Sequence, residues 1–251
     1  EIIGYLTRYP PFSIEITLNG ITKDTYESIT HALGSFETIM EIIPRLVKKR
    51  LPLIIKTNGL KQNKDEILKI KAYSDNLLSK GNFKFDSFIH PRLNGSKEPC
   101  EYRLSAEEIL DVELSDEDMV KQRDRELCKT PQLKRDKEFI YQCNSWLTEF
   151  FINPYGRVEF CYLSDDFSTD LRTTGFKEWF YGLTPRLTLE KFKTDSICKS
   201  CDLRTLCFSC PSRAFLETGD RESSVDYYCQ LAKMMGQRII NKNFNNEAAK
   251  I

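Results

Sequence analysis

The cysteines are the residues whose type and spacing point most clearly to chemistry. Seven of the nine fall between residues 143 and 229, and four of these form two pairs with two residues between the partners. Along the chain the seven are Cys143, Cys161, Cys198, Cys201, Cys207, Cys210 and Cys229. Two intervening residues let both thiolates of a pair face one metal centre while N–H groups of the loop turn toward the sulfurs. The pattern therefore predicts metal binding in this region.

Disulfides and zinc are the alternatives to an iron-sulfur site. Seven and nine are odd numbers, and a chain of 251 residues does not need disulfides to be stable. Two short cysteine pairs could form one tetrahedral zinc site, but seven thiolates exceed that need. The two histidines, His31 and His90, lie outside the region. Sulfur-only ligands leave both metals open, and the spacing favours iron-sulfur. A metal site of either kind implies a reducing, cytoplasmic compartment.

Short β segments are expected to position the first two cysteines of this region. Residues 150–153 and 157–163 read as short β segments around the turn at residues 154–156, with Val158 and Phe160 in alternation in the second segment, which predicts a hairpin. Gly156 would supply the positive φ of a tight turn, and the hairpin would bring Cys161 back toward the strand that follows Cys143. Residues 195–229 lack apolar periodicity, so we expect bound metal to organise them.

The first ninety residues predict alternating strands and helices. Ser35 is expected to cap a helix that Pro44 kinks or shortens, and Gly81 to stop the next one. The expected elements are strands at 12–18, 51–57 and 83–90, and helices from 35 and over 64–78. Their order and near-continuous apolar strands indicate parallel pairing with right-handed crossovers, in an α/β sheet or barrel.

Residues 93–142 have a different character. They contain a turn, a capping box from Ser105 to Glu108, and a heavily charged run over 111–137. We therefore expect a linker with one or two solvated helices.

Composition excludes two classes of partner. Thirty-seven basic residues balance thirty-seven acidic ones, so no net charge favours nucleic-acid binding. No apolar run is long enough to predict a membrane span, and we expect no membrane partner. Because the chain opens with Glu1 and enters a strand and helix repeat midway, we expect it to be a piece of a longer protein.

The order of the cysteines, with Gly156 before Cys161, resembles the SPASM domain of radical S-adenosylmethionine enzymes that modify peptides and proteins. Residues 15–20 (EITLNG), with the segments at 25–29 and 34–37, are similar to the middle of a radical SAM barrel, around its fourth strand. The resemblance implies an α/β fold: a partial radical SAM (β/α) barrel over 1–95, a charged helical linker over 96–142, and a small cysteine-rich α+β SPASM domain over 143–240.

The resemblance also implies which residues bind cofactors. There would be two auxiliary iron-sulfur clusters, both of the 4Fe-4S type. Cluster I would be held by Cys143, Cys161 and Cys210. Cluster II would be held by Cys198, Cys201, Cys207 and Cys229. Thr17 stands where a serine at the end of the fourth strand approaches the cofactor ribose in the family, and an ordinary strand residue is the alternative interpretation.

Two departures from the family pattern matter. Two residues separate Cys207 from Cys210, where the family usually has three, so the place of Cys210 in cluster I is open. An open iron, a non-cysteine ligand or Cys128 could complete that cluster. The C-x3-C-x2-C loop that binds the catalytic 4Fe-4S cluster and S-adenosylmethionine is absent from this sequence.

The function implied is that of a radical SAM/SPASM maturase that oxidises a peptide or protein side chain. Its reductant would be a flavodoxin or ferredoxin, and S-adenosylmethionine and a third cluster would be present only in the full-length protein. We expect this chain alone to be inactive. A noncatalytic zinc-binding interaction module is the alternative function.

Overall fold

The computed structural model describes residues 1–129, 136–143, 149–164, 168–187 and 189–248. The chain forms two compact units, Glu1–Ile89 with Glu98–Val120, and His90–Lys97 with Lys121–Ile251. The region expected to be a linker over 96–142 is therefore shared between the two units. No helix in the described part of the chain is long and apolar enough to cross a membrane.

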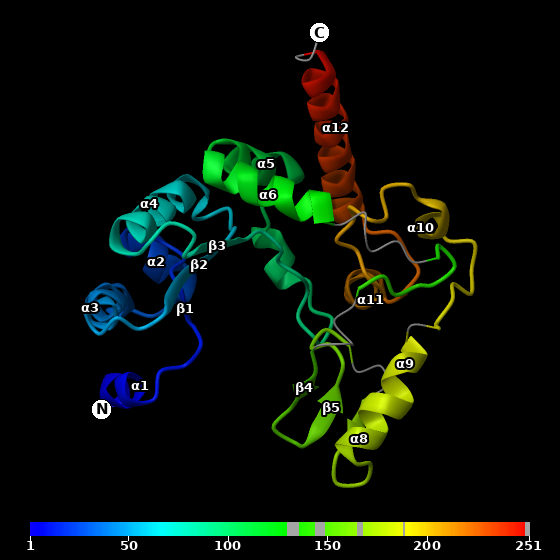
Figure 1. Ribbon diagram of the computed structural model, residues 1–251, viewed down its shortest axis with the longest axis horizontal. Helices are drawn as coiled ribbons and strands as arrows, with labels where there is room; N and C mark the ends of the chain where they lie inside the picture. The colour runs from blue at the N-terminus through cyan, green and yellow to red at the C-terminus, as the bar shows by residue number, and fades with distance from the viewer. Residues whose placement is uncertain (130–135, 144–148, 165–167, 188, 249–251) are drawn as a thin grey trace. The chain divides into compact units, whose positions relative to one another are not determined.

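The first unit contains a parallel sheet (Figure 1). Its strands are β1 (Ile14–Thr17), β2 (Leu53–Asn58) and β3 (Phe83–Asp86), in the order β1-β2-β3. Ile14 lies opposite Leu53, and Ile55 opposite Phe83. The expected parallel pairing of the three strands is confirmed. Within the described residues the sheet has three strands and is not closed, so these residues form a parallel sheet and not a barrel.

Four α-helices accompany the strands: α1 (Ile2–Arg8), α2 (Lys23–Thr30), α3 (Ser35–Lys48) and α4 (Ile67–Leu77). A short 3-10 helix, η1 (Lys64–Glu66), leads into α4. The predicted helix over 64–78 is thus divided into a tight first turn and a regular remainder.

The expected N-cap of α3 was wrong. Gly34, with a φ of +78°, occupies the N-cap position, and Ser35 is the first helical residue. The Ser35 hydroxyl instead donates to the carbonyl of Ala32 at 2.5 Å. Pro44 does not shorten α3, which continues to Lys48. Pro44 is exposed, so the carbonyl that loses its N–H partner lies on the solvent side of the helix.

The two faces of the sheet differ in chemistry. Leu53, Ile55 and Thr57 alternate as buried residues along β2, and Leu53 packs with Leu46 of α3. The other face carries two ion pairs, Lys56 with Asp86 at 3.1 Å and Lys84 with Glu15. Parallel sheets normally bury both faces. Thr17, which we expected at the cofactor ribose, is the exposed last residue of β1 and follows Glu15 at the two-residue spacing of this charged face.

Glu66 joins the start of α2 to the turn before α4. One carboxylate oxygen accepts from the backbone N–H groups of Ile21 and Thr22 at 2.6 and 3.2 Å. The other accepts from the hydroxyls of Thr22 and Thr25 at 2.6 and 2.8 Å. Burial alone would raise the pKa of Glu66, but these four hydrogen bonds hold it below the usual value. The carboxylate therefore stabilises the loop that follows β1.

The charged region is not a wholly solvated linker. It forms η2 (Glu98–Tyr102), α5 (Ala106–Leu114) and α6 (Glu117–Lys129). The predicted capping box between Ser105 and Glu108 is confirmed. Ile109, Leu110 and Val112 of α5 are buried together with Glu113, whereas Glu107 and Asp111 are exposed.

The second unit combines a small antiparallel sheet with short helices (Figure 1). Its core includes Trp179, Val158, Phe160, Ile140 and Leu187. The strands are β4 (Phe151–Ile152), β5 (Arg157–Glu159) and β6 (Thr169–Asp170), and the helices are α8 (Phe176–Glu178), the π-helical η4 (Trp179–Leu183), α9 (Thr184–Leu187), α10 (Ile197–Ser200), α11 (Pro211–Thr218) and α12 (Asp226–Ala248).

Replacing Glu66 with Gln is expected to lower the free energy of unfolding by about 1–3 kcal/mol, because an amide donor would face groups that themselves donate. The stability that the Glu66 carboxylate contributes should be fully present above pH 4.5, the ordinary pKa of a glutamate side chain. It should be lost as the pH falls through the lowered pKa of Glu66 in the folded state. Denaturant unfolding between pH 3 and pH 7 measures both effects. Glu41→Gln, at an exposed ion pair with Arg45, is the control and should change stability by less than about 0.5 kcal/mol. Equal behaviour of the two variants would contradict the role given to Glu66.

Candidate metal centres

The predicted hairpin is present and places Cys161. β4 and β5 pair antiparallel, with Ile152 opposite Val158. Gly156 has a φ of +81°, and Asn153 accepts from the N–H groups of Tyr155 and Arg157 through its side-chain oxygen at 3.0 and 3.1 Å. The turn residues thus fix the hairpin locally, and Cys161 follows β5 by two residues.

A cavity of about 390 Å³ brings together the cysteines expected to hold the first cluster. Cys143, Cys161 and Cys210 line it, and Cys207 lies on the same wall. The carboxylate of Glu149 also lines the cavity. The side chain of Cys128, the other residue considered for this cluster, lies outside the described part of the structure.

Short local contacts place the cysteines of the second group. Ser196 caps α10, and its hydroxyl oxygen accepts from the N–H of Cys198 at 3.2 Å. Glu222 accepts from the N–H groups of Lys193 and Thr194 at 2.7 and 2.8 Å, and from the Thr194 hydroxyl at 2.5 Å. Burial alone would raise the pKa of Glu222, but these bonds lower it. The carboxylate thereby attaches the segment before α10 to the loop before α12.

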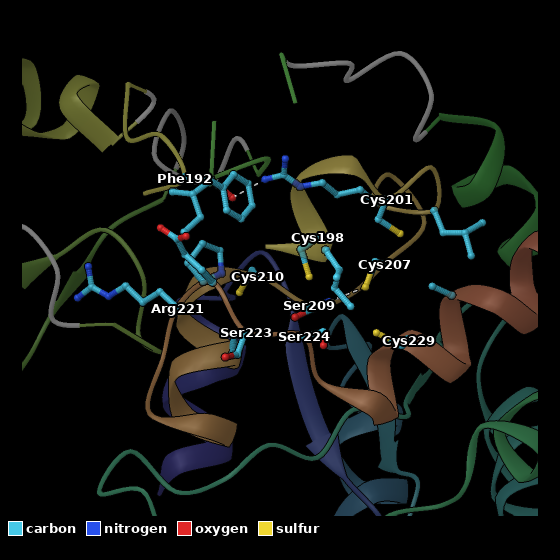
Figure 2. A pocket seen from close by; sticks show the side chains of 18 of the residues that line it. Phe192, Cys198, Cys201, Cys207, Ser209, Cys210, Arg221, Ser223, Ser224 and Cys229 are labelled. Carbon is cyan, nitrogen blue, oxygen red and sulfur yellow. Dashed lines mark hydrogen bonds between the residues drawn. The ribbon is translucent and has the colours of Figure 1, made fainter. Parts of the chain in front are cut away.

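The second group lines another cavity of about 350 Å³. Figure 2 shows Cys198, Cys201 and Cys207 projecting into one part of it, with Cys229 approaching from α12 and Cys210 to one side. The four cysteines expected to hold cluster II therefore lie around one space. Cys207 and Cys210 line both cavities.

The thiols around each cavity affect one another's ionisation. Burial raises the pKa of the Cys161 thiol, and the thiols of Cys210 and Cys143 add to the effect. Cys210 thus interacts with the first group despite its short spacing from Cys207.

The second group behaves in the same way. Burial raises the pKa of Cys207 to about 11, and the thiols of Cys229, Cys198 and Cys201 contribute to the shift. Burial likewise raises the pKa of Cys229, with contributions from Cys198 and Cys201. Each thiolate opposes ionisation of its neighbours, and a bound cation would remove that opposition. The donor set fits a thiolate-ligated metal centre.

Other observations complete the placement of the candidate residues. The eight cysteines whose side chains are described are all thiols, and Cys100 lies apart from both groups in η2 of the first unit. No set of three or more His, Cys, Asp or Glu side chains among the described residues is arranged to hold a single metal ion.

Sequence reasoning did not identify the charged residues beside the cysteines. Arg204 lines both cavities, and Arg213 lies near Cys161. Glu222 makes its bonds to residues 28 and 29 positions away. The sequence offered one signal, the position of Arg204 between Cys201 and Cys207.

The fold has a counterpart among solved structures. A chain described as tagged anSMEcpe with bound AdoMet matches with a TM-score of 0.59 and 16% sequence identity, over 97% of this chain and 68% of that one. At this identity the similarity concerns the fold. No protein-family model and no curated protein sequence matches the chain.

Replacing Gly156 with Ala is expected to destabilise the second unit by about 1 kcal/mol, because a side chain is disfavoured at positive φ. Steric clash adds little, since the nearest atom to the new Cβ is Nε of Arg172 at 3.9 Å. Gly182→Ala is the control: its φ is not in the left-handed region and no atom lies within 4 Å. Thermal unfolding should show a lower Tm for the first variant and not for the second. The reverse order would contradict the turn assignment.

Proposed function

We propose that this chain is part of a radical SAM/SPASM maturase whose cysteines hold two auxiliary iron-sulfur clusters, and which oxidises a peptide or protein side chain. One observation carries the proposal. The cysteines that the sequence resemblance assigns to one cluster line one cavity, and those assigned to the other cluster line a second cavity, with Cys207 and Cys210 lining both.

The fold supports the same family. The matching chain, anSMEcpe, is an anaerobic sulfatase-maturating enzyme and binds AdoMet. Similarity covers nearly the whole of this chain, including both the unit with the parallel sheet and the unit with the cysteines. A zinc-binding interaction module would account for four cysteines around one cavity but gives no role to the group of three.

The cysteines would hold the clusters, and the second unit would keep them in place. Cys143, Cys161 and Cys210 are assigned to cluster I, and Cys198, Cys201, Cys207 and Cys229 to cluster II. When bound, auxiliary clusters can accept an electron from an oxidised substrate or bind the substrate directly. The chain's own contribution is to hold most of the cysteines partly buried and to fix the loops that carry them.

Activity is assigned to a longer protein. The sequence contains no cysteine before Cys100, so the three-cysteine loop for the catalytic cluster and S-adenosylmethionine would be supplied outside these residues. Thr17, on the charged face of the sheet, remains the residue proposed to approach the cofactor. The proposed partners are a peptide or protein substrate and a flavodoxin or ferredoxin as reductant.

Metal analysis tests the proposal directly. Anaerobic reconstitution of this chain with iron and sulfide should yield close to two clusters per chain, with thiolate-to-iron charge-transfer absorption. Iron, sulfide and zinc are measured on the same sample. Stoichiometric zinc in anaerobically purified protein, with no iron uptake on reconstitution, would contradict the assignment and support the zinc module.

A further inference from the structure

Arg204 stands midway between two cysteines of the second group. Its backbone N–H donates to the carbonyl of Cys201 at 3.3 Å, and the N–H of Cys207 donates to the carbonyl of Arg204 at 3.3 Å. The backbone of Arg204 is thus hydrogen-bonded to both cysteines. Any displacement of this residue would be transmitted to two thiols of the group.

Arg204 is half-buried, and the hydrogen-bond partners of its guanidinium group are uncharged. It donates to the carbonyls of Lys137, Phe139 and Ile140 at 2.8, 2.6 and 2.9 Å. It also lies over the ring of Phe192, 4.6 Å from the ring centre. These partners in the described structure carry no formal negative charge, so the positive charge of Arg204 is fixed in place without being neutralised by a carboxylate.

Arg204 adjoins the cysteines of the second group in the lining of their cavity. Arg204 lines both cysteine cavities. Of the described residues that line both, it is the one with a cationic side chain. Burial lowers the pKa of Arg204, while Cys198, Cys201 and Cys207 act in the opposite direction. Arginine stays protonated under such conditions. A permanent positive charge therefore adjoins the group expected to hold cluster II.

We propose that Arg204 is a positioning residue that raises the reduction potential of the cluster held by Cys198, Cys201, Cys207 and Cys229. The inference rests on the proposed function. Adding an electron makes a thiolate-ligated cluster more negative, and a fixed cation in a poorly solvated setting stabilises the reduced form more than the oxidised form. Arg204 would in this way make the cluster a better electron acceptor.

Two substitutions separate the charge from the hydrogen bonds. Arg204→Gln removes the charge and keeps an amide that can donate to the carbonyls. Arg204→Lys keeps the charge and loses the planar guanidinium with its several N–H donors. Arg238→Met is the matched control, because Arg238 is a partly buried arginine in the same unit that pairs with Asp124 at 3.5 Å and lines neither cavity. All variants are reconstituted in the full chain, and their iron content is measured.

Redox titration with dithionite and mediators, followed by electron paramagnetic resonance, gives the potential of each cluster. The Gln variant should shift one cluster to a more negative potential, while the Lys variant and the Arg238 control stay near the wild-type value. A Gln variant with full iron and an unchanged potential would overturn the inference and leave the cluster assignment intact. Equal shifts in the Gln and Lys variants would also overturn it, because they would indicate a purely structural role.

The Gln variant could lose its iron while the Lys variant keeps it. In that case a wild-type reduction potential in the Lys variant supports the inference, and a shifted potential overturns it. A wild-type chain that takes up no iron would overturn the proposed function itself, and with it the role of Arg204.

Discussion

Concentration of thiols in a small, partly buried volume is the constraint on which the second unit depends. An ionised group removed from water without a partner costs several kcal/mol, and neighbouring thiolates add to that cost. Cys207 illustrates the conflict, since burial raises its pKa to about 11. The proposed metal centres would resolve the conflict, because a bound cation stabilises the ionised form of every ligand at once. Without a metal, the cysteines would gain little stabilisation from one another.

The surrounding structure can be understood as support for these loops. The Gly156 turn returns the chain so that Cys161 joins Cys143 at one cavity. Glu222 holds the segment before Cys198 through three hydrogen bonds. Arg204 reaches three carbonyls and spans the space between the groups. In the first unit, one face of the parallel sheet is packed and the other is charged, which is the arrangement that a polar site needs beside a rigid scaffold.

Local patterns in the sequence predicted what depends on local chemistry. The Ser105 capping box and the hairpin arise from contacts within a few residues, and the apolar patterns of the three strands predicted their parallel pairing. The division of the cysteines into two groups followed from the family resemblance. The predicted N-cap of α3 was wrong because Gly34 and Ser35 are both suitable residue types for that position. Which of the two occupies it depends on the preceding turn. The buried side of α5 and the position of Arg204, bonded to residues about 65 positions away, depend on tertiary packing that no local pattern encodes.

The central claim is that the cysteines hold two separate centres, and counting iron in paired variants tests it most directly. Cys161→Ser should remove the iron of one cluster and Cys229→Ser that of the other, so each single variant should retain about half of the wild-type iron and the double variant almost none. Cys100→Ser, in the other unit, should retain all of it. Complete loss of iron in both single variants, or no greater loss in the double variant than in either one, would contradict two independent centres.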